Sequence, residues 1–390
     1  MKRILICIQD FKQGGIPRCL QTLLAHIDAS AYKVDLFCLR HEGDYLGEMP
    51  NCRVLPEDYL LKQLMVFSSN ITWKNFIFNL PSIVLKTMRK LINKAMGHDI
   101  LLGRLTKLGN NLSSAKYDVV IAYAEGYPSV LIENVKARKR LLWIHNDYAF
   151  QGARQGSSLT NYAAFSTICC VSRATKESFD AFFPQYANKT KVIYNLTNDK
   201  FIRERAKQPI NDTRFDENGE AFSIVSVGRV CAQKNFVVIP SIVHDLHFHG
   251  VMGVKWFIIG DGPELERACV EQEIRKYGVE DTVVLLGNKP NPFPYLSKAD
   301  LFVLTSVYES YPTVINEAKV LNIPIMANNI PPAHEMLQTD KAIIVGIKDM
   351  ASKIAELIKN KNKYDSMKHQ RYDFTKSNMA IMGDFYALME

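Results

Sequence analysis

The chain has 390 residues, of which 47% are hydrophobic and 23% are charged, and its formal net charge at pH 7 is +8. This length can hold two domains with separate cores, and the composition is ordinary for a soluble globular protein. The eight cysteines form no CxxC pair and no metal-ligand spacing, which excludes a cysteine-based zinc site. Most of them lie in apolar runs, which is typical of small buried residues in a reducing compartment.

The charge is unevenly distributed along the chain. The first 200 residues hold 26 Lys and Arg against 16 Asp and Glu, a net of +10, whereas the remaining residues hold 22 against 24, a net of −2. A basic first half and a near-neutral second half indicate different partners for the two halves.

The chain begins with a strand, a glycine-containing turn and a helix. Residues 2–8 (KRILICI) have the pattern of a buried strand, and their apolar run is too short for a signal peptide. A polar loop leads to Gly14 and Gly15, after which leucines at helical spacing predict a helix. Such a turn allows the backbone to approach a ligand closely, or it is only a tight turn. The loop matches neither a P-loop nor a G-x-G-x-x-G fingerprint.

Residues 60–108 are basic and apolar, with Asp99 as their one acidic residue. Their basic residues, interleaved with aromatic and aliphatic ones, are Lys62, Lys74, Lys86, Arg89, Lys90, Lys94, Arg104 and Lys107. No uncharged run is long enough to cross a bilayer. The composition favours helices that lie in an anionic membrane surface. The alternative is a pair of ordinary amphipathic helices with solvated lysines.

Two more buried strands are predicted at residues 117–122 and 139–145. Polar residues follow each of them, as expected at the carboxyl ends of a parallel sheet, where ligands bind. His145 ends the second strand and is a candidate site residue for that reason, although a lone histidine is often structural. Further on, residues 203–220 are polar and turn-rich, which is typical of a linker.

The second half opens with a strand at 222–228, followed at once by Arg229 and, five positions further, by Lys234. Two cations beyond a strand end and near a helix N-terminus can neutralise a pyrophosphate as it leaves. The alternative is that both are solvated surface residues. A nicotinamide fingerprint at Gly260 fails, because Leu265 stands where the third glycine should be.

The most informative stretch combines a strand, a turn and a helix. An apolar run at 301–304 predicts a buried parallel strand, and after a polar turn Thr313 opens a helix. The N–H groups from Ser310 onward suit a phosphate. Glu309 and Glu317 would be repelled by that phosphate, so we expect them to accept hydrogen bonds from the hydroxyls of a ribose or a hexose. The pattern indicates a nucleotide sugar, against the simpler reading of two solvated surface charges.

The segment ESYPTVINE, from Glu309 to Glu317, resembles the E-x7-E signature of the retaining GT-B glycosyltransferases of glycosyltransferase family 4. The segments GRVCAQKN, GDGP, WIHND and VIYNLTND resemble further segments of that family, with Leu196 in place of a usual glycine in the last. The resemblance implies that Glu317 binds the donor ribose, that Glu309 and His145 face the donor sugar, and that a glycine-rich first loop covers the phosphates.

The loop that begins at Asn288 is expected to bracket the base. The expected catalytic residues are Arg229, Lys234, Glu309 and His145. The expected donor-binding residues are Gly15, Gly228, Asn288, Ser310, Tyr311, Pro312, Thr313 and Glu317.

The strand–helix alternation in both halves predicts an α/β protein with two doubly wound Rossmann-like domains facing a central cleft, and the resemblance implies that this fold is GT-B. We expect an N-terminal acceptor-binding domain at 1–200 and a C-terminal nucleotide-sugar donor-binding domain at 201–373. The resemblance implies that a last helix at 374–390 packs back on the first domain. No two aspartates stand two residues apart, so the D-x-D site of the other main glycosyltransferase fold is absent and we expect neither metal nor cofactor.

These features predict a retaining glycosyltransferase that moves a hexose from a nucleotide-diphosphate sugar to a lipid-linked glycan in cell-surface polysaccharide synthesis. Family frequency favours a UDP-sugar, with guanine as the second choice of base. We expect no nucleic-acid partner and a cytoplasmic protein, peripheral on the inner face of the cell membrane, held by residues 60–108. The alternatives are a non-catalytic GT-B partner subunit that binds nucleotide sugar or membrane, and a sugar-nucleotide epimerase of the same fold.

Overall fold

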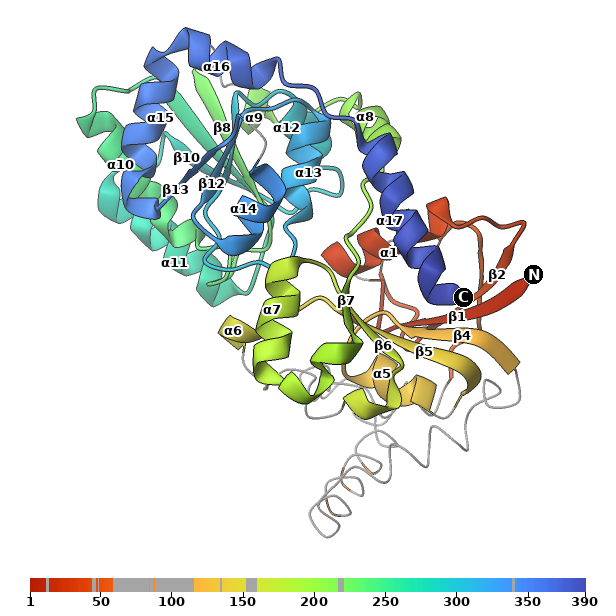
Figure 1. Ribbon diagram of the computed structural model, residues 1–390. Helices are drawn as coiled ribbons and strands as arrows, with labels where there is room; N and C mark the ends of the chain where they lie inside the picture. The colour runs from red at the N-terminus through yellow and green to blue at the C-terminus, as the bar shows by residue number, and fades with distance from the viewer. Residues whose placement is uncertain are drawn as a thin grey trace. The chain divides into compact units, whose positions relative to one another are not determined.

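The computed structural model describes residues 1–11, 14–43, 47, 49–58, 84, 87, 91, 116–133, 135–151, 160–216, 221–338 and 341–390. The described chain forms two compact units, each with its own parallel sheet (Figure 1). Unit 1 consists of Met1–Leu196 and Met379–Glu390, and unit 2 of Thr197–Asn378. No helix in the described ranges is both long enough and apolar enough to span a bilayer.

The described part of unit 1 contains a seven-stranded parallel sheet in the order β3-β2-β1-β4-β5-β6-β7. Its strands are β1 (Lys2–Ile8), β2 (Tyr32–Cys38), β3 (Cys52–Val54), β4 (Lys116–Ala122), β5 (Lys136–Ile144), β6 (Thr167–Cys170) and β7 (Thr190–Val192). The interior strand β1 is buried from Ile4 to Ile8, as expected for an apolar run that is covered on both faces.

The helices in the described part of unit 1 are α1 (Gly15–His26), α5 (Tyr127–Glu133), α6 (Tyr148–Gln151), η7 (Tyr162–Ala164), α7 (Arg173–Phe182) and η8 (Pro184–Lys189). Several of them bury apolar side chains, among them Leu20 and Leu24 of α1 and Phe179 of α7. The last residues of helix α17 (Phe374–Met389) also belong to unit 1. There Phe385 is fully buried, with its ring 6.1 Å from that of Trp143, and Tyr386 stacks on Tyr32 at 5.2 Å.

The described part of unit 2 contains a six-stranded parallel sheet in the order β10-β9-β8-β11-β12-β13. Its strands are β8 (Phe222–Val227), β9 (Val254–Ile259), β10 (Val283–Gly287), β11 (Leu301–Leu304), β12 (Ile325–Asn328) and β13 (Ile343–Val345). Trp256 and Phe257 follow each other in β9, point to opposite faces and are both fully buried, each in a different apolar cluster. Helices therefore cover both faces of this sheet.

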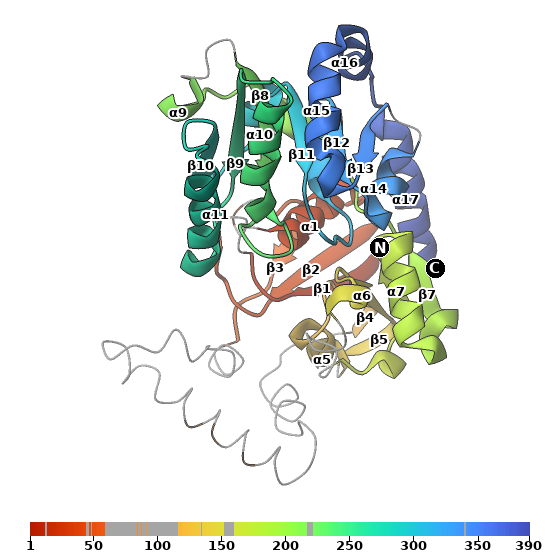
Figure 2. The same ribbon diagram turned by 90° about the vertical axis from the view of Figure 1, so that its left-hand side faces the viewer.

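Helices α10 (Ile239–Phe248), α11 (Glu264–Tyr277) and α15 (Met350–Lys359) pack in the cluster on one face (Figure 2). Helices α12 (Phe293–Ser297), α13 (Thr313–Val320) and α14 (Pro331–Leu337) pack in the cluster on the other (Figure 1). The other helices in the described part of unit 2 are α8 (Asp199–Ala206), α9 (Thr213–Asp216), η9 (Phe236–Val238), η10 (Ile347–Asp349) and α16 (Lys361–Lys368).

Two glycines allow the loops after β8 and β9 to touch through their backbones. A Cβ added to Gly260 would lie 1.8 Å from the carbonyl oxygen of Gly228, and one added to Gly262 would lie 1.9 Å from that of Val230. The same loops are joined by a hydrogen bond from Val230 N to the carbonyl oxygen of Asp261 at 3.0 Å. The Gly-Asp-Gly-Pro turn therefore supports the loop that carries Arg229.

The prediction of two doubly wound α/β domains is confirmed. The segment 203–220 was predicted as a linker, but part of it belongs to the folded unit 2. Helix α8 extends to Ala206, and Phe215 is buried with its ring 4.6 Å from that of Phe257. The polar composition concealed two apolar residues of this segment, the buried Phe215 and the partly buried Ile210, which pack in the same apolar cluster. The predicted membrane contact at 60–108 lies outside the described residues, except for positions 84, 87 and 91.

Candidate functional site

The predicted donor-site residues of unit 2 follow the ends of three strands. Arg229 and Lys234 follow β8, Asn288 follows β10 and Glu309 follows β11. Because all strands of this sheet are parallel, these positions lie at one edge, the carboxyl edge, where α/β proteins bind ligands. Arg229 and Asn288 are exposed, whereas Glu309 is buried.

Lys234 and Glu309 form an ion pair in which both side chains are largely buried. The lysine side chain is 16% exposed and the glutamate side chain 9%. The same carboxylate accepts hydrogen bonds from Ser306 Oγ at 2.8 Å and from Gln233 Nε2 at 3.4 Å. A buried carboxylate needs such partners because removing it from water is costly. These contacts hold Glu309 and the ammonium group of Lys234 in fixed positions.

Contacts with the loop after β11 also fix the backbone that carries Lys234. Thr305 Oγ1 donates a hydrogen bond to the carbonyl oxygen of Lys234 at 2.7 Å, and Val307 N donates one to that of Gln233 at 2.9 Å. A Cβ added to Gly228 would lie 2.8 Å from Lys234 Cε. Glycine at this position leaves room for the lysine side chain on its way to the glutamate.

Helix α13 places Glu317 beneath the same edge. The turn before the helix contains Ser310, Tyr311, Pro312 and Thr313. No side chain caps the first turn of α13, in which Ile315 N donates to the carbonyl oxygen of Pro312 at 3.0 Å. The N–H groups at such a helix N-terminus suit a phosphate. Glu317 is 4% exposed, and its neighbour Asn316 donates hydrogen bonds to Thr197 Oγ1 at 2.9 Å and to Tyr311 Oη at 3.2 Å.

The other two predicted site residues, Gly15 and His145, belong to unit 1. Gly15 is the exposed first residue of α1, and a Cβ added to it would meet no atom within 4 Å. His145 follows β5 directly, and its ring centroid lies 5.1 Å from that of Tyr123. Burial lowers the pKa of His145 to about 4. The imidazole is therefore neutral at pH 7 and can act as a hydrogen-bonding group but not as a cation.

A family model matches most of unit 2. Residues 207–374 match the model of the family Glycosyl transferases group 1, and we refer to these residues as the group 1 domain. This group 1 domain contains all the predicted site residues of unit 2.

Curated relatives resemble the chain over longer stretches. An uncharacterized glycosyltransferase of Methanocaldococcus jannaschii is 24% identical over 246 residues, which are 59% of this chain and 60% of that protein, less than two thirds of its length. The N-acetylgalactosamine-N,N'-diacetylbacillosaminyl-diphospho-undecaprenol 4-alpha-N-acetylgalactosaminyltransferase of Campylobacter jejuni is 22% identical over 337 residues, 84% of this chain and 81% of that enzyme. The homologues of the group 1 domain therefore include a bacterial enzyme with a lipid-linked acceptor.

Solved structures resemble the chain over its whole length. Anabaena HepE in complex with UDP and glucose has a TM-score of 0.70 at 17% identity, covering 99% of this chain and 100% of that chain. At this identity the likeness establishes the fold, which is GT-B.

The sequence analysis did not predict Gln233 and Ser306, the side chains that hold Glu309 in the group 1 domain. Gln233 precedes Lys234 within the motif that carries the resemblance, so its position was a usable signal. Ser306 gave no such signal, because only the folded loop brings its hydroxyl to the carboxylate.

A second buried polar network, in unit 1, was also not predicted. Glu125 lies beyond the end of β4 and is 8% exposed. Its carboxyl group accepts hydrogen bonds from Tyr162 Oη at 2.6 Å, from Tyr148 Oη and from Asn146 Nδ2 at 3.1 Å. Burial raises the pKa of Glu125 to about 7, and hydrogen bonds from Tyr162 and Asn146 partly oppose that rise. The network joins the loops after β4 and β5, the second of which carries His145.

We expect the substitution Glu125→Gln to remove part of the pH dependence of stability. The folded-state pKa of about 7 lies above the ordinary value of 4.5, so the protonated carboxyl group stabilises the folded state. The contribution of Glu125 to the free energy of unfolding, obtained as the difference between wild type and Glu125→Gln, should therefore fall by on the order of 3 kcal/mol as the pH rises between these two values. Urea unfolding across this range measures it, with the exposed Glu264→Gln as the control. Equal pH dependence in wild type and Glu125→Gln would contradict this role.

Proposed function

We propose that the chain is a retaining glycosyltransferase that transfers a hexose from a nucleotide-diphosphate sugar, a UDP-sugar, to a lipid-linked glycan in cell-surface polysaccharide synthesis. The observation that carries the proposal is the buried Lys234–Glu309 pair at the carboxyl edge of the group 1 domain, whose glutamate lies four residues before α13. UDP in the HepE complex supports the donor, and the diphospho-undecaprenol in the name of the C. jejuni relative supports the acceptor.

Each predicted site residue has a role in this proposal. The departing diphosphate is stabilised by Arg229 and Lys234, because a nearby cation lowers the cost of charge that develops on a leaving group. Glu317 binds the ribose hydroxyls, and Glu309 and His145 bind the hydroxyls of the sugar. The remaining donor contacts are Gly15, Gly228, Asn288 and the turn Ser310, Tyr311, Pro312 and Thr313.

The reaction proceeds by front-face attack. The acceptor hydroxyl oxygen forms a bond to C1 of the sugar on the face from which the nucleoside diphosphate departs. The bond between C1 and the β-phosphate oxygen breaks, and the hydroxyl proton passes to that oxygen. Configuration at C1 is retained, and no covalent enzyme intermediate is needed. Of the protein groups, Lys234 lowers the barrier of this step most, because its positive charge stabilises the negative charge that grows on the leaving phosphate.

The two halves of the chain divide the substrates between them in this proposal. Residues 201–373 bind the donor, and the basic residues 1–200 bind the acceptor. Residues 60–108 hold the protein on the inner face of the cell membrane, since their basic and apolar composition suits an anionic surface. Cosedimentation with vesicles of anionic and of neutral lipid tests this part, and equal binding to both would contradict it.

The proposed function predicts slow donor hydrolysis by the purified chain in the absence of acceptor. A panel of UDP-sugars and GDP-sugars is first screened by thermal shift, because a ligand that binds only the folded state raises Tm. The stabilising donors are then incubated with the protein, and release of nucleoside diphosphate is measured with and without EDTA. We expect UDP-sugars to raise Tm and to be hydrolysed at the same rate in both conditions.

The possible results separate the alternatives. Donor binding without hydrolysis or transfer would favour the non-catalytic partner subunit. Conversion of the donor into a different UDP-sugar would favour the epimerase. No stabilisation by any nucleotide sugar would overturn the proposal.

A further inference from the structure

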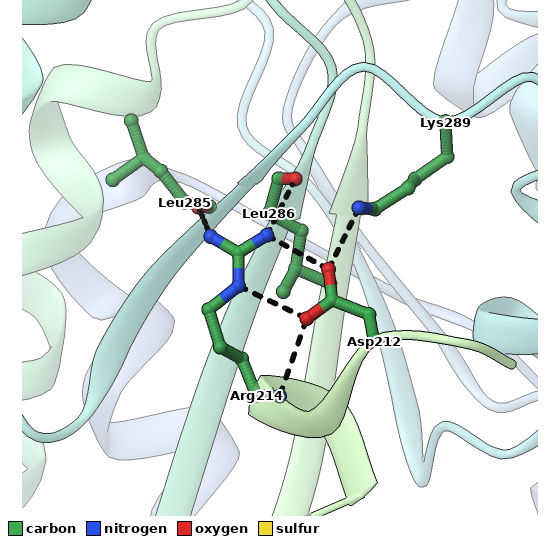
Figure 3. A network of polar contacts seen from close by, with 5 residues as sticks. All are labelled: Asp212, Arg214, Leu285, Leu286 and Lys289. Carbon is green, nitrogen blue, oxygen red and sulfur yellow. Dashed lines mark hydrogen bonds and ion pairs between the residues drawn. The ribbon is translucent and has the colours of Figure 1, made fainter.

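The carboxyl end of β10 is held by a segment that precedes β8 in the sequence. β10 is an edge strand of the sheet of unit 2, and its register with β9 shifts between Leu285 and Gly287. At this irregularity Arg214 donates hydrogen bonds to two successive carbonyl oxygens, those of Leu285 at 3.0 Å and Leu286 at 3.1 Å (Figure 3). In a regular strand successive carbonyls point in opposite directions, so the bulge is what allows one guanidinium to bind both. Arg214 therefore fixes the point where the strand ends.

Asp212 links this arginine to the loop beyond the strand. Its carboxylate accepts hydrogen bonds from Arg214 Nε at 2.9 Å and Nη2 at 2.7 Å, and from Lys289 Nζ at 2.7 Å (Figure 3). The side chains of Asp212 and Lys289 are 10% and 19% exposed. Hydrogen bonds from Arg214 and Lys289 hold the pKa of Asp212 far below its ordinary value, so the group is a carboxylate at every physiological pH.

The far end of the same loop is tied to the same segment. Asn291 Nδ2 donates hydrogen bonds to the carbonyl oxygen of Arg205 and to Gln208 Oε1, both at 2.8 Å. Phe215 anchors the segment in the core, where its ring lies 5.2 Å from that of Tyr295. Residues 205–215 thus fasten the loop at two points, Lys289 and Asn291.

We propose that Asp212 is a positioning residue for donor binding: by holding Lys289 it fixes the loop from Asn288 to Pro292, against which the nucleoside end of the donor rests. This inference depends on the proposed function, in which Asn288 contacts the base. Lys289 is then a structural cation, already neutralised by Asp212, and differs from Lys234, which acts on the diphosphate. A loop that is ordered before binding lowers the entropic cost of association.

The test is a mutant cycle read by UDP and GDP titration calorimetry and by steady-state kinetics. We expect Asp212→Asn and Lys289→Met each to raise the Kd of UDP by about tenfold, with unchanged kcat at saturating donor, because they remove binding shared by the ground and transition states. The double variant should bind about as weakly as either single variant, because both act through one contact. The matched control is Glu356→Gln, a carboxylate on α15 that also accepts from two lysines, Lys353 and Lys363, and it should bind UDP as wild type does.

Several outcomes would overturn the inference. One is a lowered Tm in Asp212→Asn with a wild-type Kd for UDP, which would mean that the contact stabilises the fold but has no role in binding. Another is tighter UDP binding by Asp212→Asn, which would mean that a freed Lys289 binds phosphate. A loss of kcat in Lys289→Met without weaker UDP binding would make this lysine a catalytic cation.

If Asp212→Asn does not fold, Lys289→Met alone tests the inference, since this variant leaves the Asp212–Arg214 pair in place. If wild type binds neither UDP nor GDP, the proposed function fails together with the inference, whereas wild-type binding that the variants do not alter refutes the inference alone.

Discussion

Lys234→Ala is expected to lower kcat for glycosyl transfer by about 100- to 1,000-fold, with a smaller change in donor KM. The ammonium group is held by Glu309 at the carboxyl edge, and in the proposed reaction it faces the diphosphate as negative charge develops on it. An interaction that strengthens in the transition state contributes to kcat more than to ground-state binding. Steady-state kinetics with a hydrolysable UDP-sugar and its acceptor, or donor hydrolysis alone, measures the effect.

The same substitution leaves Glu309 buried without its cation, and this second effect has to be separated from catalysis. Removing one partner of a buried ion pair costs about 3 kcal/mol or more of stability. Glu309→Gln in combination with Lys234→Ala should restore most of this stability, because a neutral amide replaces the uncompensated charge, but it should not restore kcat. Lys255→Ala is the control lysine, since its Nζ donates only to the backbone oxygen of Asp281 at 2.6 Å in the described structure. Wild-type kcat in the folded Lys234→Ala protein would remove Lys234 from the mechanism.

Glu317→Ala is expected to raise donor KM by about 10- to 100-fold while kcat at saturating donor changes little. The carboxylate is 4% exposed and lies on α13, where it is proposed to accept hydrogen bonds from the ribose hydroxyls. A hydrogen bond to a charged group contributes about 1.5–3 kcal/mol, which sets this range. Titration with UDP and kinetics with the UDP-sugar provide the two readouts.

A deoxyribose analogue makes this second prediction specific. Wild type should bind UDP more tightly than 2′,3′-dideoxy-UDP, and Glu317→Ala should not distinguish them, because the group that recognises the hydroxyls has been removed. Glu264→Ala, which replaces an exposed glutamate at the start of α11, should discriminate as wild type does. Equal discrimination by Glu317→Ala and wild type would show that the ribose is recognised elsewhere.

The secondary structure of both units could be predicted because it follows from local patterns. Apolar runs such as residues 2–8 and 301–304 became buried parallel strands, since a strand covered on both faces must be apolar throughout. The predicted linker at 203–220 shows the limit of such patterns. Phe215, together with the partly buried Ile210, anchors this polar segment in the core, and two isolated apolar residues carry no periodicity.

The candidate site could be predicted as a set of residues but not as a set of contacts. Arg229, Lys234 and Glu309 follow predicted strand ends, and in a parallel sheet such positions gather at one edge, whereas Glu317 was predicted on the helix that follows the last of these strands. That Lys234 pairs with Glu309, across 75 positions of sequence, was not predictable, because the pairing depends on how the loops after β8 and β11 lie against each other.

The sequence by itself determined the two-sheet α/β architecture, the residue types available for a diphosphate and for sugar hydroxyls, and the strand ends at which they stand. These properties depend on hydrophobic periodicity and on motifs, which are local along the chain. Only the tertiary structure decided which of these groups are paired, buried or neutral: Glu309 with Lys234, Asp212 with Lys289, and the uncharged His145. Burial and long-range contacts set the energy of a charged group, and both arise only when segments distant in sequence pack together.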